Sequence, residues 1–372
     1  MARILRGWFS WGIPDLPLLG IVLTLLFVGV LVLSSVSASF SLQKTGNSFF
    51  YLNHQLLFGF LPGILAAVFL LSLRLEVLKR WSFPLLLVTA ALLLLVFVPG
   101  IGKDVGGAHR WIFLGPFSFQ PSELLKITFI LYAAFWLSAR TKGTLQKQFL
   151  GVLLPFGIVS GAIALLLFLQ PDMSTLGVIG AVALTMYFVS GTPLWHIPIF
   201  LGTGAAAFLG LLILSPYRLS RLSVFLDPSL DPLGKGYQIK QALIGIGSGG
   251  LWGTGLSFQK FGFLPEPMSD SVFAVFAEEM GFVGAVFLIT LFLLFAWRGL
   301  WVARHVKDPF AKIAAAGITS WIIVQAFLHM GALTGILPLT GIPLPFISYG
   351  GSALVAELLG VGILLTISKQ AV

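Results

Sequence analysis

The chain has 372 residues, of which 58% are hydrophobic and only 9% charged, with a net charge of +9 and a mean hydropathy of +1.01. These values are typical of a membrane protein with several spanning helices and exclude an ordinary water-soluble enzyme. The chain contains no cysteine, which excludes disulfide bonds and thiol chemistry.

Ten apolar stretches approach or exceed the roughly 20 residues that a helix needs to cross the hydrocarbon core of a bilayer. They predict an all-α polytopic membrane protein that forms a single domain, 1–372, with a long outer loop, 216–270, between the seventh and eighth helices. The predicted spans are 18–36, 50–73, 82–98, 121–138, 150–170, 173–190, 195–215, 271–297, 311–337 and 347–368. No small-residue cleavage site precedes the first stretch, so we expect a retained helix and not a signal peptide.

Lysine and arginine residues in the short loops predict the orientation of these helices. With ten spans both termini lie on one side, and that side carries most of the basic residues: Arg3, Arg6, Arg74, Lys79, Arg80, Arg140, Lys142, Lys147, Arg298, Arg304, Lys307, Lys312 and Lys369. The short loops of the other side, with their helix ends, hold only Lys44, Lys103, Arg110 and Lys126. We therefore expect cytoplasmic termini and an extracytoplasmic loop 216–270. The positive charge then favours anionic membrane lipid, whereas nucleic acid would need basic residues clustered on a soluble face.

Within the long outer loop, apolar residues recur at helical spacing, at Ile239, Ala242, Leu243 and Ile246. They predict a short amphipathic helix that lies in the membrane interface. Such a helix serves either as a surface beside a lipid-borne substrate or as a lid that seals the bundle, and the sequence favours neither.

The first polar constellation follows the third predicted span. Arg110 and Lys126 put two cations near the outer membrane edge, where a guanidinium and an ammonium group suit phosphate. Glu123 lies three residues before Lys126, so these two side chains can instead form an ion pair on one face of the helix. Trp111 suits either an interfacial anchor or a substrate contact. All four are candidate substrate-binding residues.

Two further polar constellations follow along the chain. Asp172, in the stretch 170–175, suits the N-cap of the next helix, and this interpretation is favoured over a substrate contact. Arg218 and Arg221 lie three residues apart just outside the membrane. They suit either lipid headgroups or a phosphorylated substrate.

Asp270 ends a polar stretch, 265–270, at the start of an apolar run. An acid at the boundary of a membrane helix is costly unless it has a use, although an acid in the first turn also suits the helix dipole. Gln325, His329 and Glu357 are polar groups at membrane depth. We expect these three to pair inside the bundle without contact to substrate.

Five stretches that contain most of these residues occur in a fixed order: 107–126, 170–175, 227–255, 264–284 and 335–352. Together they resemble the SEDS (shape, elongation, division and sporulation) family, which contains RodA and FtsW. The pieces 236–238 and 259–265 are more similar to the division-type branch, FtsW and SpoVE, than to RodA. The resemblance implies a peptidoglycan glycosyltransferase that polymerises lipid II at the outer face of the cytoplasmic membrane, for cell division or cell shape. It also implies a class B penicillin-binding protein as transpeptidase partner.

The resemblance also implies roles for particular residues. Asp270 matches the essential outer-loop aspartate of the family, and Arg110, Trp111, Lys126 and Asp172 match its other polar positions. The family usually has His-Thr where this chain has Met268-Ser269, and Arg or Gln where it has His109.

On the implied reaction, Asp270 is the expected general base for a sugar hydroxyl of the incoming lipid II. The leaving pyrophosphate needs cations, for which Arg110, Lys126, Arg218 and Arg221 are the candidates. No cofactor is certain. A divalent ion, Mg²⁺ or Mn²⁺, between the carboxylate and the pyrophosphate is the one candidate, although no metal-ligand set is apparent in the sequence.

Two other functions stay open. One is a transporter that flips lipid II across the membrane, which broken helices and charges at the membrane midplane would favour. The charges of this chain concentrate near the outer edge instead, which favours chemistry at a face. The other is a non-catalytic scaffold for the transpeptidase, which leaves the boundary charges unexplained.

Overall fold

The computed structural model describes residues 12–371 apart from 106–107, 115–116, 141–148, 194, 197, 200, 203, 205, 207–209, 211–222 and 257–263. In this part of the chain, eight helices are long and apolar enough to cross a membrane, and one further apolar helix is shorter. They coincide with nine of the ten predicted spans and confirm a membrane-embedded helical bundle. The seventh predicted span, 195–215, falls largely outside the described residues.

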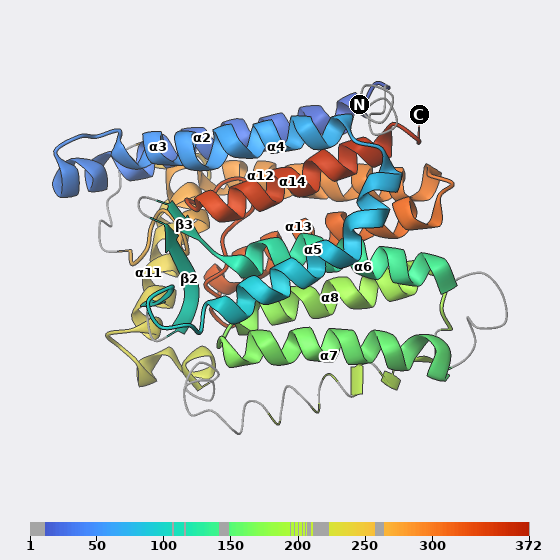
Figure 1. The fold of residues 1–372 in the computed structure, drawn as a ribbon. Coiled ribbons are helices and arrows are strands. Elements are labelled where there is room, and N and C mark those ends of the chain that lie inside the picture. Colours follow the sequence, from blue (N-terminus) through green and yellow to red (C-terminus); the bar gives the residue numbers. More distant parts are fainter. Residues whose placement is uncertain are drawn as a thin grey trace.

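The spanning elements are α2 (Leu16–Thr45), α3 (Phe50–Gln55) with η1 (Leu56–Phe60) and α4 (Leu61–Ser72), α5 (Leu75–Leu95), α6 (Pro121–Arg140), η3 (Phe149–Leu153) with α7 (Leu154–Leu169), the shorter α8 (Met173–Val189), α12 (Val272–His305), α13 (Pro309–Leu333) and α14 (Gly351–Ser368). α13 is the central helix, because it packs against α6, α8, α12 and α14 and is buried along most of its length. Figure 1 shows α2 and α4 on one flank of the bundle and α7 on the opposite flank.

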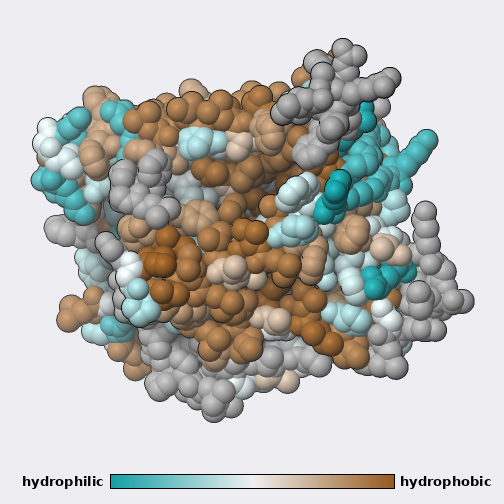
Figure 2. All heavy atoms as spheres, in the orientation of Figure 1, coloured by the Kyte–Doolittle hydropathy of each residue, from teal (hydrophilic) through white to brown (hydrophobic). Residues whose placement is uncertain are grey.

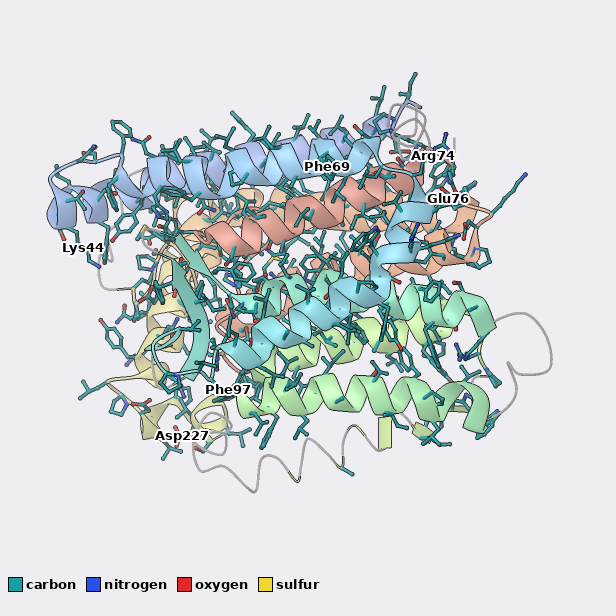
Figure 3. The ribbon with its side chains drawn as sticks, viewed as in Figure 1. Lys44, Phe69, Arg74, Glu76, Phe97 and Asp227 are labelled. Carbon is teal, nitrogen blue, oxygen red and sulfur yellow. The ribbon has the colours of Figure 1, made fainter. Side chains whose placement is uncertain are left out.

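The two ends of the bundle differ. At one end, the backbone N–H of Asp15 donates to Ser368 Oγ at 2.9 Å, and Arg298 donates hydrogen bonds to both oxygens of the Asp15 carboxylate, so that α2, α12 and α14 are joined there. The helix α11 (Lys235–Ser248) and the strands lie at the other end (Figure 1). Figure 3 shows Arg74 near the first end and Lys44 near the second.

The surface between these ends is apolar. Figure 2 shows a broad hydrophobic belt with hydrophilic residues gathered at both ends of the molecule. Large side chains of the belt are exposed, such as Leu65 and Phe69 of α4. This is the surface that a lipid bilayer covers, since the hydrocarbon core excludes polar groups and accepts aliphatic and aromatic ones.

A small sheet, which the sequence did not predict, lies between α5 and α6. Its strands β1 (Gly102–Val105), β2 (Ala108–Leu114) and β3 (Phe117–Phe119) pair antiparallel in the order β1-β2-β3. In β2, Ile112 is buried and its neighbour Phe113 is exposed, which is the alternation of a strand. The strands are short and lie among glycines, so this alternation is too brief to be recognised in the sequence.

The long helix α12 is broken at Gly281, which has φ 66° and ψ −168°. The backbone N–H groups of Phe282 and Val283 donate to the carbonyl oxygens of Gly250 and Leu251 at 2.8 and 3.1 Å. A Cβ atom on Gly281 would lie 2.6 Å from the Leu251 carbonyl oxygen, so a larger residue does not fit. The turn that follows α11 thereby supplies the partners that the broken helix would otherwise lack inside the membrane.

The helix α11 lies in the part of the loop 216–270 where the sequence predicted a short amphipathic helix. It packs against α12 through a buried face that includes Ile239 and Ala242. The sequence predicted Leu243 on the same apolar face, but its side chain is 46% exposed. The buried face continues from Ala242 to Gly245 instead. The helix therefore has one face on the bundle and a second apolar side that points outward.

Candidate active site

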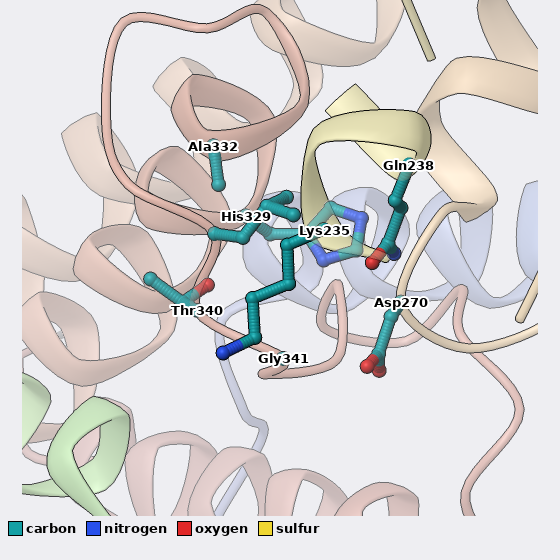
Figure 4. A pocket seen from close by; sticks show the side chains of 8 residues that line it. Lys235, Gln238, Asp270, His329, Ala332, Thr340 and Gly341 are labelled. Atoms are coloured by element: carbon teal, nitrogen blue, oxygen red, sulfur yellow. The ribbon is translucent and has the colours of Figure 1, made fainter. Parts of the chain in front are cut away.

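Asp270 lines a cavity at the end of the bundle that carries α11 (Figure 4). The cavity is lined by Lys235, Gln238, Asp270, His329, Ala332, Leu339, Thr340 and Gly341, which come from α11, the loop before α12, the end of α13 and the loop that follows it. Its volume is about 70 Å³, whereas pockets that enclose a whole small molecule measure roughly 300–1,000 Å³. A ligand of ordinary size therefore enters this cavity only in part.

Hydrogen bonds within the loop that carries Asp270, and from two other segments, fix this loop. Ser271 Oγ donates to the Pro265 carbonyl at 2.8 Å and accepts from Gln238 Nε2 of α11 at 3.1 Å. Ser348 Oγ donates to the Ser269 carbonyl at 2.7 Å. These bonds hold the residues on both sides of Asp270, which is itself half-buried, and so fix where its backbone lies.

Gly341 forms the wall of the cavity beside the Asp270 carboxylate. A Cβ atom on Gly341 would lie 3.4 Å from Asp270 Oδ2, and the residue has φ 65°, a conformation that favours glycine. Across the cavity, the Lys235 side chain extends toward Thr340 and Gly341 (Figure 4). One acid and one cation thus share the cavity, which gives it both a proton acceptor and a positive charge.

His329 closes the floor of the cavity from α13. Its ring is only 2% exposed, and Nδ1 lies 2.8 Å from the Ile342 carbonyl oxygen. A carbonyl oxygen only accepts, so Nδ1 carries the hydrogen. The sequence predicted that His329 would pair inside the bundle, and this bond confirms that expectation. The ring also lines the cavity, which the sequence did not indicate.

The candidate residues Glu123 and Lys126 do not line this cavity. They form an ion pair 2.8 Å long, and both side chains are almost completely buried. Lys126 Nζ also donates to Gln325 Oε1 at 2.8 Å and lies over the Trp321 ring. This is the ion pair within one helix that the three-residue spacing allowed. Lys126 is therefore not exposed for a phosphate contact, which was the alternative interpretation.

Gln325 and Glu357 complete the buried network around Lys126. Gln325 Nε2 donates to the Pro343 carbonyl at 3.0 Å and lies 3.4 Å from Glu357 Oε1. Glu357 Oε2 accepts from the Phe346 backbone N–H at 2.8 Å. Both groups pair inside the bundle, as the sequence predicted. The network holds the loop after α13, whose earlier residues line the cavity.

Asp172 caps α8, as the sequence predicted, by accepting from the Thr175 backbone N–H at 3.2 Å. Arg110 of β2 donates to the carbonyl oxygens of Gln170 and Pro171, which lie just before this cap. Its guanidinium group therefore joins the sheet to the start of α8. Neither Arg110 nor Asp172 is among the residues that line the cavity.

The start of α8 is tied in turn to the cavity wall, because Ser174 Oγ donates to the carbonyl oxygen of Thr340. The stretch 170–175 thus supports the wall from behind. Trp111 neighbours Arg110 on β2, is partly buried, and pairs with Lys103 in the sheet register. Arg218 and Arg221 lie outside the described residues.

Lys235, Gln238 and Thr340 belong to the cavity but were not among the sequence candidates. Lys235 and Gln238 lie three residues apart at the start of the predicted interfacial helix, on one face of it. The apolar residues of that helix predicted its existence, and they gave no indication of chemistry on its polar face. The three-residue spacing was the available signal for Lys235 and Gln238.

Comparisons with known proteins give the family of this chain. The model of the FtsW/RodA/SpoVE family of cell cycle proteins matches residues 16–372. The chain belongs to this family.

Among curated relatives of this FtsW/RodA/SpoVE chain, the stage V sporulation protein E of Bacillus subtilis (strain 168) is 40% identical over 96% of this chain and 97% of the relative. The probable peptidoglycan glycosyltransferase FtsW of Geobacter sp. (strain M18) is also 40% identical, with the same coverage. Both names belong to the branch that 236–238 and 259–265 resemble.

Two solved structures share the fold. A chain from a study of the structural coordination of polymerization and crosslinking by a peptidoglycan synthase complex has a TM-score of 0.80 and 29% identity, and the match covers 96% of this chain and 98% of that one. The crystal structure of the rod shape determining protein RodA of Thermus thermophilus has a TM-score of 0.71 and 27% identity, with 96% and 97% covered. The predicted all-α polytopic membrane fold is thereby confirmed for this FtsW/RodA/SpoVE chain.

Proposed function

We propose that this chain is a peptidoglycan glycosyltransferase that polymerises lipid II into glycan strands. The observation that carries the proposal is a carboxylate, Asp270, and a cation, Lys235, in one cavity at one end of a membrane bundle. Relatives at 40% identity over nearly the whole chain are named as probable peptidoglycan glycosyltransferases, which supports the same activity here.

The reaction needs one general base. Asp270 removes the proton from a sugar hydroxyl of the incoming lipid II while the hydroxyl oxygen bonds to the anomeric carbon of the growing glycan. The bond from that carbon to the pyrophosphate oxygen breaks, and the pyrophosphate leaves with the electron pair and its polyprenyl tail. Asp270 then releases its proton to water. The fixed backbone position of Asp270 serves this role, because a base must lie within hydrogen-bond reach of the proton that it takes.

The leaving pyrophosphate needs positive charge, and Lys235 is the cation that lines the cavity with the base. It lies in the first turn of α11, where the helix dipole adds to its attraction for phosphate. Lys126 is occupied by Glu123 and Gln325. We therefore assign the phosphate contact to Lys235 in addition to the candidates Arg218 and Arg221.

A divalent cation, Mg²⁺ or Mn²⁺, is also part of the proposal. Among the described residues no group of three or more His, Asp or Glu side chains is placed to hold a metal. Mg²⁺ is often bound by one or two carboxylates together with substrate phosphates, and Asp270 is the carboxylate that fits this pattern. When bound, such an ion would neutralise charge on the pyrophosphate. Dependence of turnover on added Mg²⁺, and its loss with a chelator, test this part.

The proposed partners are lipid II, membrane lipid and a class B penicillin-binding protein that supplies the transpeptidase. The match to a chain of a peptidoglycan synthase complex, at a TM-score of 0.80, supports a transpeptidase partner. Co-purification of the chain with such a protein, and a change in polymer yield on its addition, test the partnership.

We propose the cytoplasmic membrane as the location, with both termini inside and the Asp270 cavity outside. The basic residues of the short loops support this orientation. Because the chain has no cysteine, single engineered cysteines give a clean test. Trp252→Cys, at a site that is 80% exposed beside α11, should react with a membrane-impermeant thiol reagent in whole cells, and Arg304→Cys should not.

The deciding experiment is polymerisation of fluorescent lipid II by the purified chain in detergent, with and without its transpeptidase partner. Detergent offers no sealed compartment, so a transporter or a scaffold would give no polymer of its own there. Glycan strands that require Asp270 support the proposal. Their absence from a folded preparation with the partner present would overturn it.

A further inference from the structure

His329 is a buried polar side chain of the cavity whose second ring nitrogen has no hydrogen-bond partner among the described residues. Nδ1–H donates to the Ile342 carbonyl at 2.8 Å, which fixes both the ring orientation and the tautomer. In a neutral imidazole with hydrogen on Nδ1, Nε2 carries a lone pair and only accepts. Within the described part of the chain nothing donates to this atom, although the ring is 2% exposed.

A buried acceptor without a donor is unfavourable, and native proteins contain few of them. His329 lines the same cavity as Asp270, and Nε2 itself has almost no accessible surface, so a ligand in the cavity reaches this atom only after a small shift of the cavity wall. The missing donor indicates a contact of this kind, and the chemistry of the atom restricts which group of the ligand it meets.

Pyrophosphate oxygens accept hydrogen bonds and offer no hydrogen to a lone pair. Sugar hydroxyls and acetamido N–H groups do donate. Asp270 is also an acceptor, so these two side chains place two acceptors beside the same cavity. A sugar ring that carries adjacent donors matches this pair, with one donor on each acceptor.

We propose that His329 Nε2 binds a hydroxyl or N–H of the acceptor sugar, next to the hydroxyl that Asp270 deprotonates. This inference rests on the proposed glycosyltransferase function and deepens it, because it assigns the recognition of the acceptor sugar to α13. Two hydrogen bonds to one ring fix its orientation, whereas Asp270 alone leaves the ring free to rotate about a single bond. His329 is thus a substrate-binding residue that aligns the nucleophile.

The test compares His329→Leu, which removes the acceptor, with His329→Gln, whose amide oxygen reaches about as far as Nε2. Lipid II polymerisation is measured with thermal stability recorded for each variant. We expect His329→Leu to lower kcat/KM for lipid II by roughly tenfold to a hundredfold, and His329→Gln to recover most of it. Ser320→Ala is the matched control, because Ser320 is a polar residue of α13 whose hydroxyl bonds within its own helix and does not line the cavity. It should leave the kinetics unchanged.

A second arm uses lipid II analogues in which one donor beside the attacking hydroxyl is removed, as a deoxy or an N-methylated sugar. One analogue should slow the wild type by a similar factor and slow His329→Leu no further, since the contact is already lost there. Equal slowing of both proteins by every analogue overturns the proposal, and so does a folded His329→Leu with wild-type kinetics. If His329→Leu does not fold, the analogues are tested on the wild type alone. Equal rates with lipid II and with every analogue then overturn the proposal. A wild type that makes no polymer overturns the proposed function instead.

Discussion

Gln325 and His329 lie one turn apart on α13 and bind successive carbonyl groups of the same loop. Gln325 Nε2 donates to Pro343 at 3.0 Å, and His329 Nδ1 donates to Ile342 at 2.8 Å. The first contact belongs to the buried network of Lys126, and the second to the cavity. The loop after α13 is therefore the structural link between the ion pair in the membrane and the proposed catalytic site.

Asp270→Asn should leave the protein folded and lower polymerisation by about 10²–10⁴-fold, the usual contribution of a general base. The amide has the same shape but does not take up a proton. Polymer length and yield from fluorescent lipid II give the measurement. Asp227→Asn makes the same chemical change at an exposed site of the loop 216–270 and should have no effect. Full polymer yield from Asp270→Asn would remove Asp270 from the role of base.

Lys235→Gln should lower turnover more than tenfold without loss of stability, because the cavity would lose a cation near the leaving pyrophosphate. Lys240→Gln is the matched control, since Lys240 is an exposed lysine on the same helix that does not line the cavity. Steady-state kinetics of both variants show whether Lys235 contributes to turnover. Equal rates for the two would leave the phosphate contact to other residues.

Lys126→Met should destabilise the protein by about 3–5 kcal/mol, because Glu123 would remain as a buried charge without its partner. The double variant Glu123→Gln/Lys126→Met removes both charges and should regain most of the loss. Thermal unfolding in detergent measures both. If Lys126→Met is as stable as the wild type but slow, the cation acts in turnover and the structural interpretation is wrong.

Gly281→Ala should destabilise the protein by about 2–4 kcal/mol, through strain at positive φ and collision with the turn after α11. Gly180→Ala is the control, because Gly180 is an exposed helical glycine of α8 where an added Cβ atom would meet no atom of the described residues within 4 Å. It should leave stability unchanged or raise it by about 1 kcal/mol. A wild-type melting temperature for Gly281→Ala would contradict the tight packing at the break.

The pairing of Asp308 with Lys79 predicts a pH dependence. Burial raises the pKa of Asp308, but the hydrogen bond and charge of Lys79 and the backbone N–H groups of Phe310 and Ala311 outweigh it, so the pKa lies below its ordinary value. A lowered folded pKa stabilises the protein above the unfolded pKa, and this stability is lost as the pH falls through the folded value.

Asp308→Asn should therefore lower the melting temperature at neutral pH, and the difference from the wild type should shrink as the pH falls below the ordinary range of an aspartate. Melting curves recorded from neutral to acidic pH give the measurement. A difference that grows on acidification would contradict the assigned sign.

Much of the bundle followed from local signals in the sequence. The helix α6 begins at Pro121, where the fourth predicted span begins, and Asp172 caps α8, as its residue type predicted. The end of α12 was placed too early, at residue 297, because hydropathy marks only the apolar length. The helix continues through Arg298, which pairs with Asp15, to His305.

The cavity depended on contacts that no local pattern encodes. Asp270 could be predicted because an acid at a membrane boundary stands out in an apolar chain. The place of His329 in the cavity depends on a loop that folds back to bring Ile342 against α13. The place of Lys235 in the cavity depends on how α11 packs on α12. Such placements come from tertiary packing, and only the structure supplies them.

The break in α12 has a practical consequence for engineering. The turn after α11 forms hydrogen bonds with α12 on both sides of Gly281, so the length of this turn is fixed. One added or deleted residue would leave several buried backbone N–H and C=O groups without hydrogen-bond partners. Affinity tags and fluorescent reporters for this end of the molecule therefore belong in another part of the loop. The surroundings of Leu230, which is 62% exposed, offer room for them without touching this junction.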